Sequence, residues 1–168
     1  MTNAKQKIKV KQRLHFLPLK KHHTNIRRLH SNLDPVHHHL EAEKPHLFFL
    51  MKIATPLDVA YLNYPGYSLE HKFKKQAGVC VYVRDDICCR RLHCFEKSGF
   101  SAIWLLVDTG VEKFLYIGVN RSHSGKQETT ALFNFLVEST DIAQQRYPTA
   151  KLIFLGDFNA HHTEWLFP

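Results

Sequence analysis

The segment from Leu152 to Asn159 constrains the fold of this 168-residue chain more than any other. Four apolar residues, Leu152 to Leu155, predict a buried β-strand, and Gly156 after them allows the chain to approach another group closely. Asp157 and Asn159 are two residues apart, so an extended backbone would point both side chains the same way, about 6–7 Å apart. An acid and an amide at a strand exit lie where open α/β sheets bind ligands. An ordinary strand-to-turn exit is the alternative, because both residue types favour turns.

Short apolar and β-branched segments elsewhere predict further strands. The predicted strands, of which the last is the strand before Gly156, are His46–Leu50, Gly78–Arg84, Ser101–Val107, Lys113–Val119 and Lys151–Leu155. A turn at Asp108-Thr109-Gly110 would join the third strand to the fourth.

Two stretches have helical character. Asp34 and Pro35 are typical of an N-cap and a first helical residue, and this helix would end near Glu43. From Glu128 to about Tyr147, apolar residues recur at helical spacing. A single domain of mixed α/β class is therefore expected, since the chain is long enough for one hydrophobic core.

Positive charge is concentrated near the N-terminus. Residues 1–30 contain nine of the 23 Lys and Arg residues and no acid, which leaves 14 basic and 15 acidic residues in the remainder. We predict that residues 1–24 form a flexible basic arm. Such a segment would attract phosphates non-specifically through counterion release. A solvated tail without a partner is the alternative interpretation.

Composition argues against several classes of protein and site. No apolar run approaches the roughly 20 residues that a membrane span needs, and the N-terminus lacks the apolar core of a secretory signal. The spacing of the four cysteines does not match a structural zinc site, so reduced thiols in an intracellular protein are expected. The consecutive histidines His37, His38 and His39 would splay around a helix, so a dedicated histidine metal site is not expected.

With these elements in order, the chain resembles the endonuclease/exonuclease/phosphatase family. It is most similar to the endonuclease domain of animal non-LTR retrotransposon (reverse transcriptase) polyproteins. The segments that carry the resemblance are Asn25–Leu33, Gly78–Arg84, Val119–Gly125 and Gly156–His161. The resemblance covers residues 25–168. It implies an α/β fold, a β-sandwich flanked by helices, whose members hydrolyse phosphate esters with a divalent cation, usually Mg²⁺.

The resemblance also implies roles for individual residues. Asn25 would help to arrange the phosphate and metal surroundings, Asp157 would orient or deprotonate the attacking water, and Asn159 would donate a hydrogen bond to the phosphate. Three further residues, at the end of the strand over residues 113–119 and in the loop that follows, would contact the substrate: Asn120, Arg121 and His123.

Asn120 stands where the family has a substrate-contacting tyrosine. Two further departures from the family pattern affect the expected activity. Lys52 occupies the position of the family's metal-binding glutamate, and lysine cannot supply the oxygen ligand that Mg²⁺ requires. The chain also ends at Pro168, before a late Ser-Asp-His-like motif that supplies the family's catalytic histidine, so a C-terminally truncated domain is expected. His161 and His162 do not replace that histidine.

We therefore expect an endonuclease-like hydrolase domain with weak or no activity, no confident metal ligand and doubtful Mg²⁺ binding. The resemblance favours DNA as the partner, no membrane association is expected, and protein partners are not indicated. Two alternatives stay open: a non-catalytic nucleic-acid-binding remnant, and a decayed transposon fragment without a selected function.

Overall fold

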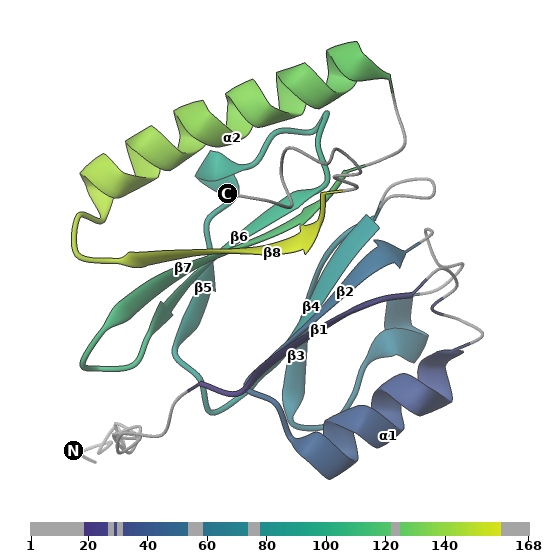
Figure 1. The fold of residues 1–168 in the computed structure, drawn as a ribbon. Helices are drawn as coiled ribbons and strands as arrows, with labels where there is room; N and C mark the ends of the chain where they lie inside the picture. Colours follow the sequence, from purple (N-terminus) through teal and green to yellow (C-terminus); the bar gives the residue numbers. More distant parts are fainter. Residues whose placement is uncertain are drawn as a thin grey trace, which may run out of the picture.

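The computed structural model describes residues 19–26, 29, 32–53, 59–73, 78–121 and 125–158. Within these residues, two four-stranded sheets pack face to face, and one helix lies on the outer side of each sheet (Figure 1). The fold is therefore the mixed α/β sandwich flanked by helices that was predicted.

The first sheet has the strand order β1-β2-β4-β3. Its strands are β1 (Lys21–Asn25), β2 (Leu47–Ile53), β3 (Tyr67–Lys72) and β4 (Gly78–Arg84). The strands β1 and β2 are parallel, because helix α1 (Leu33–Glu43) makes the crossover between them. The strand β4 is antiparallel to both of its neighbours.

The second sheet has the order β5-β6-β7-β8. Its strands are β5 (Cys89–Arg91), β6 (Ala102–Asp108), β7 (Lys113–Asn120) and β8 (Lys151–Asp157). Helix α2 (Lys126–Arg146) makes the crossover between the parallel strands β7 and β8. Two 3₁₀-helices, η2 (Val59–Leu62) and η3 (His93–Phe95), complete the described elements. Neither α1 nor α2 combines the length and apolarity that a membrane span requires.

Apolar side chains form three layers between these elements. Phe49 and Met51 of β2 lie in the core between the two sheets. Leu40 of α1 packs on the outer face of the first sheet, and Leu132 and Leu136 of α2 pack on the outer face of the second. The strand β2 is thus covered on both faces, as its continuous apolar run indicates.

Most predicted elements are confirmed. The strand over Gly78–Arg84 has the predicted bounds, and the other four predicted strands correspond to β2, β6, β7 and β8 with slightly shifted ends. The turn at Asp108-Thr109-Gly110 is present: Gly110 adopts φ +82° and its N–H donates to Asp108 Oδ1 at 2.8 Å. The four cysteines are free thiols, as expected. Strands β1, β3 and β5 were not predicted.

The predicted start of the first helix is wrong by two residues. Helix α1 begins at Leu33 with Asn32 at the cap, so Asp34 and Pro35 lie inside the first turn. Asp34 is therefore not the cap residue, but its negative charge in the first turn is favourable near the helix N-terminus. Proline is tolerated in the first turn, because the N–H groups there have no partner within the helix.

The expectation of a buried strand after residue 150 is also wrong. In β8, Leu152, Ile153 and Leu155 are half-buried, and 40% of Phe154 is exposed. The reason is position in the sheet, since β7 is the only neighbour of β8 among the described strands. Phe158, after the strand, packs against the cluster under α2.

Strand β1 begins at Lys21, inside the segment assigned to the basic arm. Its side chains alternate between exposed and half-buried, as on an edge strand, so its sequence of Lys, His, His, Thr and Asn lacks an apolar signal. Backbone pairing with β2, from Lys21 opposite Leu47 to Asn25 opposite Met51, orders it instead. Residues 1–18 of the predicted arm lie outside the described residues.

Candidate functional site

Strands from both sheets end close together at one edge of the sandwich, where three polar side chains meet. Asn25, the last residue of β1, donates from Nδ2 to Asp157 Oδ2 at 3.2 Å. The Lys52 ammonium lies 2.5 Å from the same oxygen. Because Asn25 and Lys52 belong to the first sheet and Asp157 ends β8 of the second, these contacts bridge the two sheets. The structure therefore brings together two predicted catalytic residues and the lysine at the expected glutamate position.

A β-bulge in β2 directs Lys52 toward Asp157. Met51 pairs with Val79 and Ile53 pairs with the adjacent Gly78, so Lys52 is an extra residue in its strand. Met51 packs between the sheets whereas Ile53 packs under α1, which shows that the side-chain alternation shifts at the bulge. Lys52 adopts φ +61°, a left-handed conformation that is uncommon for a residue with a Cβ.

Asp157 is positioned by the close pairing of β8 with β7. It lies opposite Asn120 in the register, and its carbonyl oxygen accepts a hydrogen bond from Arg121 N at 2.9 Å. A Cβ at Gly156 would lie 1.8 Å from the carbonyl oxygen of Val119, so only glycine permits this approach. The close approach predicted at Gly156 is confirmed, and the group approached is the Val119 backbone.

Two of the predicted substrate-contacting residues are held by hydrogen bonds to other residues of the chain. Asn120 is buried, and its Nδ2 donates to the carbonyl oxygen of Gly78 at 3.2 Å, which ties β7 to the start of β4. Its Oδ1 has no hydrogen-bond partner among the described residues. Arg121 is half-buried, and its Nη1 donates to Thr129 Oγ1, near the start of α2, at 3.4 Å. Both residues flank Asp157.

Other residues named from the sequence fall outside the described part of the chain. These are the predicted catalytic Asn159, the predicted substrate contact His123, and the paired histidines His161 and His162. Their predicted roles stay predictions.

The described residues do not fit a divalent metal ion at this site. No group of three or more His, Cys, Asp or Glu side chains among them could hold one. A divalent cation at Asp157 would also meet the Lys52 ammonium: at 4 Å and an effective dielectric constant of 20, the repulsion would be about 8 kcal/mol. With 22% of the Lys52 side chain and 12% of Asp157 exposed, water screens this pair only in part. The site as built holds an ammonium ion where the family pattern has a metal ligand.

Two histidines, one from β1 and one from α1, are in close contact. His22 Nδ1 and His39 Nε2 lie 2.6 Å apart, and the ring of His39 also contacts Phe48. These side chains line a pocket of about 700 Å³ between β1 and α1 that reaches Asn25. Burial, and then the neighbouring His22, lower the pKa of His39, so this imidazole is held in its neutral form at neutral pH.

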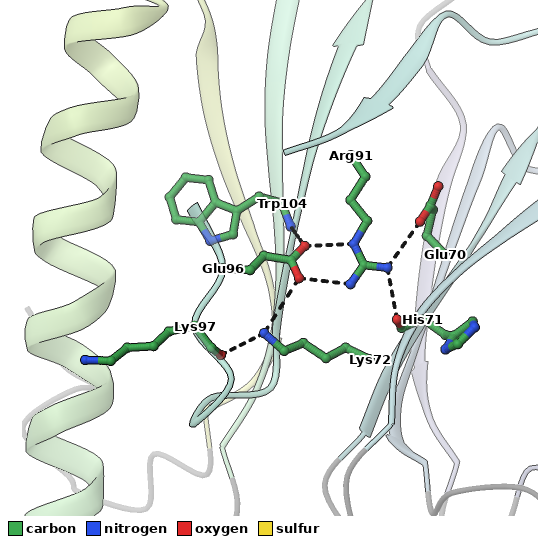
Figure 2. Close-up of polar contacts among 7 residues, drawn as sticks. All are labelled: Glu70, His71, Lys72, Arg91, Glu96, Lys97 and Trp104. Atoms are coloured by element: carbon green, nitrogen blue, oxygen red, sulfur yellow. Dashed lines mark hydrogen bonds and ion pairs between the residues drawn. The ribbon is translucent and has the colours of Figure 1, made fainter. Parts of the chain in front are cut away.

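A second polar cluster, which sequence reasoning missed, joins the sheets at the opposite edge (Figure 2). Arg91 of β5 donates from Nε and Nη2 to the two carboxylate oxygens of Glu96 at 2.8 and 2.9 Å. Its Nη1 reaches β3, donating to Glu70 Oε2 at 3.2 Å and to the His71 carbonyl at 2.9 Å. Lys72 lies 3.6 Å from Glu96. We refer to these residues as the Arg91 cluster.

The Arg91 cluster is closed and mostly buried. Only 12% of the Arg91 side chain and 7% of the Glu96 side chain are exposed. Burial alone would raise the pKa of Glu96, but the hydrogen bonds and charge of Arg91, with the charge of Lys72, bring that pKa below its ordinary value. The cluster therefore has the features of a structural clamp between β3 and β5.

Comparison with known proteins adds the family. The sequence model of the Endonuclease/Exonuclease/phosphatase family matches residues 22–168, which is most of the chain. No curated protein matches the chain significantly.

Several solved structures share the fold. D. rerio TDP2, complexed with a single-strand DNA product, has a TM-score of 0.58 at 20% identity over 82% of this chain and 57% of that one. The endonuclease domain of TRAS1, a telomere-specific non-LTR retrotransposon, gives 0.62 at 13% identity over 85% and 61%. The 3′ phosphatase NExo from Neisseria, bound to a product DNA hairpin, gives 0.55 at 18% identity over 84% and 58%.

The chain spans less than two thirds of the length of each of these three structures. At such low identities the similarity concerns the fold alone. The family match covers strands of both sheets, both helices and the Asn25–Lys52–Asp157 contact. The chain therefore belongs to the Endonuclease/Exonuclease/phosphatase family.

Proposed function

We propose that this chain is a phosphodiester hydrolase domain directed at DNA, related to the endonuclease of a non-LTR retrotransposon, in which Lys52 impairs hydrolysis. The contact between the Lys52 ammonium and Asp157 carries the proposal. The family match supports the hydrolase class, and the likeness to the TRAS1 endonuclease domain supports the retrotransposon relation. The DNA products bound to TDP2 and NExo support DNA as the substrate.

The chemistry of Asp157 explains the impairment. A carboxylate that accepts a proton from water must be basic and accessible, but Asp157 Oδ2 already contacts an ammonium and an amide. The divalent cation of the family would neutralise charge on the phosphoryl oxygens, and no group of three or more His, Cys, Asp or Glu among the described residues could hold such an ion. Both effects lower the rate of hydrolysis.

Binding without cleavage is the second candidate function, and the same ion pair favours it. The Lys52 ammonium at the site, and the basic residue Arg121 next in the chain to Asn120, favour attraction of a phosphodiester. The basic residues among the first 20 would add to this attraction.

A plasmid-nicking assay with the purified chain in Mg²⁺ tests the proposal. The wild-type protein should nick supercoiled DNA slowly or not at all. The Lys52→Glu variant restores an oxygen ligand and should nick faster, and adding Asp157→Ala to it should abolish the gain.

Lys52→Met is the matched control, because it removes the ammonium without supplying a ligand. Mg²⁺ should also raise the Tm of Lys52→Glu but not that of the wild type, which tests metal binding separately from catalysis. Fast, Mg²⁺-dependent nicking by the wild type that Asp157→Ala abolishes would contradict the impairment.

A further inference from the structure

The Lys52 ammonium occupies the site as a built-in cation. It lies 2.5 Å from Asp157 Oδ2 of the second sheet, and Lys52 itself is the bulged residue of β2 in the first sheet. An ammonium group has three N–H donors, and Asp157 is its ion-pair partner among the described residues. The remaining donors can face an anion that enters the site from solvent, since about a fifth of the side chain is exposed (22%).

Asn25 adds a neutral donor beside this cation. Its Nδ2 carries two hydrogens, and one of them is directed at Asp157. Asn25 is an exposed residue at the end of an edge strand, so an anion can reach its amide. The ammonium and the amide together offer a charged and a neutral donor around one carboxylate oxygen.

The neighbouring strand β7 contributes a rigid support. Arg121 follows β7, and its backbone N–H is bonded to the carbonyl oxygen of Asp157. The pairing of β7 with β8, and the bond from Asn120 to Gly78, hold this part of the site in place. Preorganised donors lose little freedom when a ligand binds, which favours recognition at a fixed point.

We propose that Lys52 takes the place of a metal ion in ligand recognition, so that this site binds a phosphodiester group of the DNA backbone without any divalent cation. This inference rests on the proposed function for its DNA ligand. It assigns Lys52 as the residue that determines binding and makes the affinity independent of Mg²⁺.

The test measures the fluorescence anisotropy of a labelled single-stranded oligodeoxynucleotide titrated with the full chain. Titrations in MgCl₂ and in EDTA at matched ionic strength should give the same Kd. Lys52→Met should weaken binding about tenfold, which is typical for loss of a charge-assisted hydrogen bond. It should also reduce the slope of log Kd against log salt by about one.

Three controls separate the role of Lys52 from its charge and from folding. Lys113→Met removes an exposed lysine at the far end of β7, so it should bind like the wild type. Lys52→Arg keeps the charge and should retain binding even if Lys52→Met is unstable. Asp157→Asn removes the negative charge that opposes the phosphodiester and should tighten binding, whereas a metal-mediated site would lose affinity.

The proposal is overturned if EDTA abolishes binding, or if Lys52→Met binds as tightly as Lys113→Met. Weak competition by inorganic phosphate is expected, and displacement by it as effective as by unlabelled oligonucleotide would overturn the assignment to the DNA backbone. The two proposals can fail separately. A wild-type chain that nicks plasmid rapidly would contradict impaired hydrolysis, yet it could still bind the oligonucleotide in EDTA as this inference requires.

Discussion

Lys52 with Asp157 at one edge of the sandwich, and Arg91 with Glu96 at the other, each place a cation and a carboxylate between the two sheets. At the second edge, a guanidinium engages both oxygens of the carboxylate in a planar, two-point contact. At the first edge, an ammonium and an amide both contact a single oxygen.

The backbone differs between the two regions as well. Arg91 lies in a regular strand, whereas Lys52 lies on a bulge at φ +61°. Strained residues are more often retained at binding sites than in structural contacts. The comparison teaches that an ion pair suits a structural role when both groups are buried and fully hydrogen-bonded, as in Arg91–Glu96. It suits ligand binding when N–H donors stay accessible, as in Lys52–Asp157.

The largest effect should come from opening the Arg91 cluster. Arg91→Met leaves Glu96, whose side chain is 7% exposed, without its two-point partner and with only the more distant Lys72 ammonium, 3.6 Å away, as a counter-charge among the described residues. We expect a loss of about 3–5 kcal/mol in the free energy of unfolding, as for other broken buried pairs, measured by urea denaturation. The neighbouring Arg90→Met is the control, because Arg90 is exposed and its side chain hydrogen-bonds the Tyr147 hydroxyl rather than a buried carboxylate. Equal losses from the two variants would remove the distinction between the regions.

The pH dependence of stability should come next. The pKa of Glu96 is lower in the folded chain than its ordinary value of 4.5, so the folded state favours the ionised form. Its contribution to stability is therefore complete above that value and is lost as the pH falls below it. Glu96→Gln should flatten the decline in Tm below about pH 4.5. If the decline in Tm at low pH is the same in Glu96→Gln as in the wild type, other carboxylates determine the acid sensitivity of the fold.

The smallest stability change is expected at Lys52. Lys52→Gly removes a partly exposed ion pair, but it also relieves the left-handed backbone, so the two effects should cancel to within about 1 kcal/mol. Lys52→Met loses the ion pair without this relief and should be the less stable of the two. Oligonucleotide binding should weaken in both. A loss for Lys52→Gly as large as that for Arg91→Met would assign a structural role to the lysine as well.

Much of the fold could be predicted because its central strands are covered on both faces. Strands such as β4 then need continuous β-branched and apolar runs, and these are visible in the sequence. Edge strands have no such requirement. The strand β1 is polar and β5 is short, so both are determined by pairing partners far along the chain.

The candidate site could be predicted only in part. Asp157 was identified from its place at a strand exit and Asn25 from a family resemblance, and the structure brings them together. The contact of Lys52 with Asp157 depends on a bulge, and a lysine gives no sign of positive φ as a glycine or asparagine would. The Arg91 cluster was missed because charged residues on short strands look like solvent-exposed pairs until the partner sheet is known.

The bond between Asn25 and Asp157 joins residues 132 positions apart. Contacts of such high sequence separation require large loops to close, so they form slowly and late in folding. Neither sheet alone contains the site: both parallel pairs, β1 with β2 and β7 with β8, must form and then dock. We therefore expect the site to assemble in the last step of folding and to be lost in any intermediate whose sheets have separated.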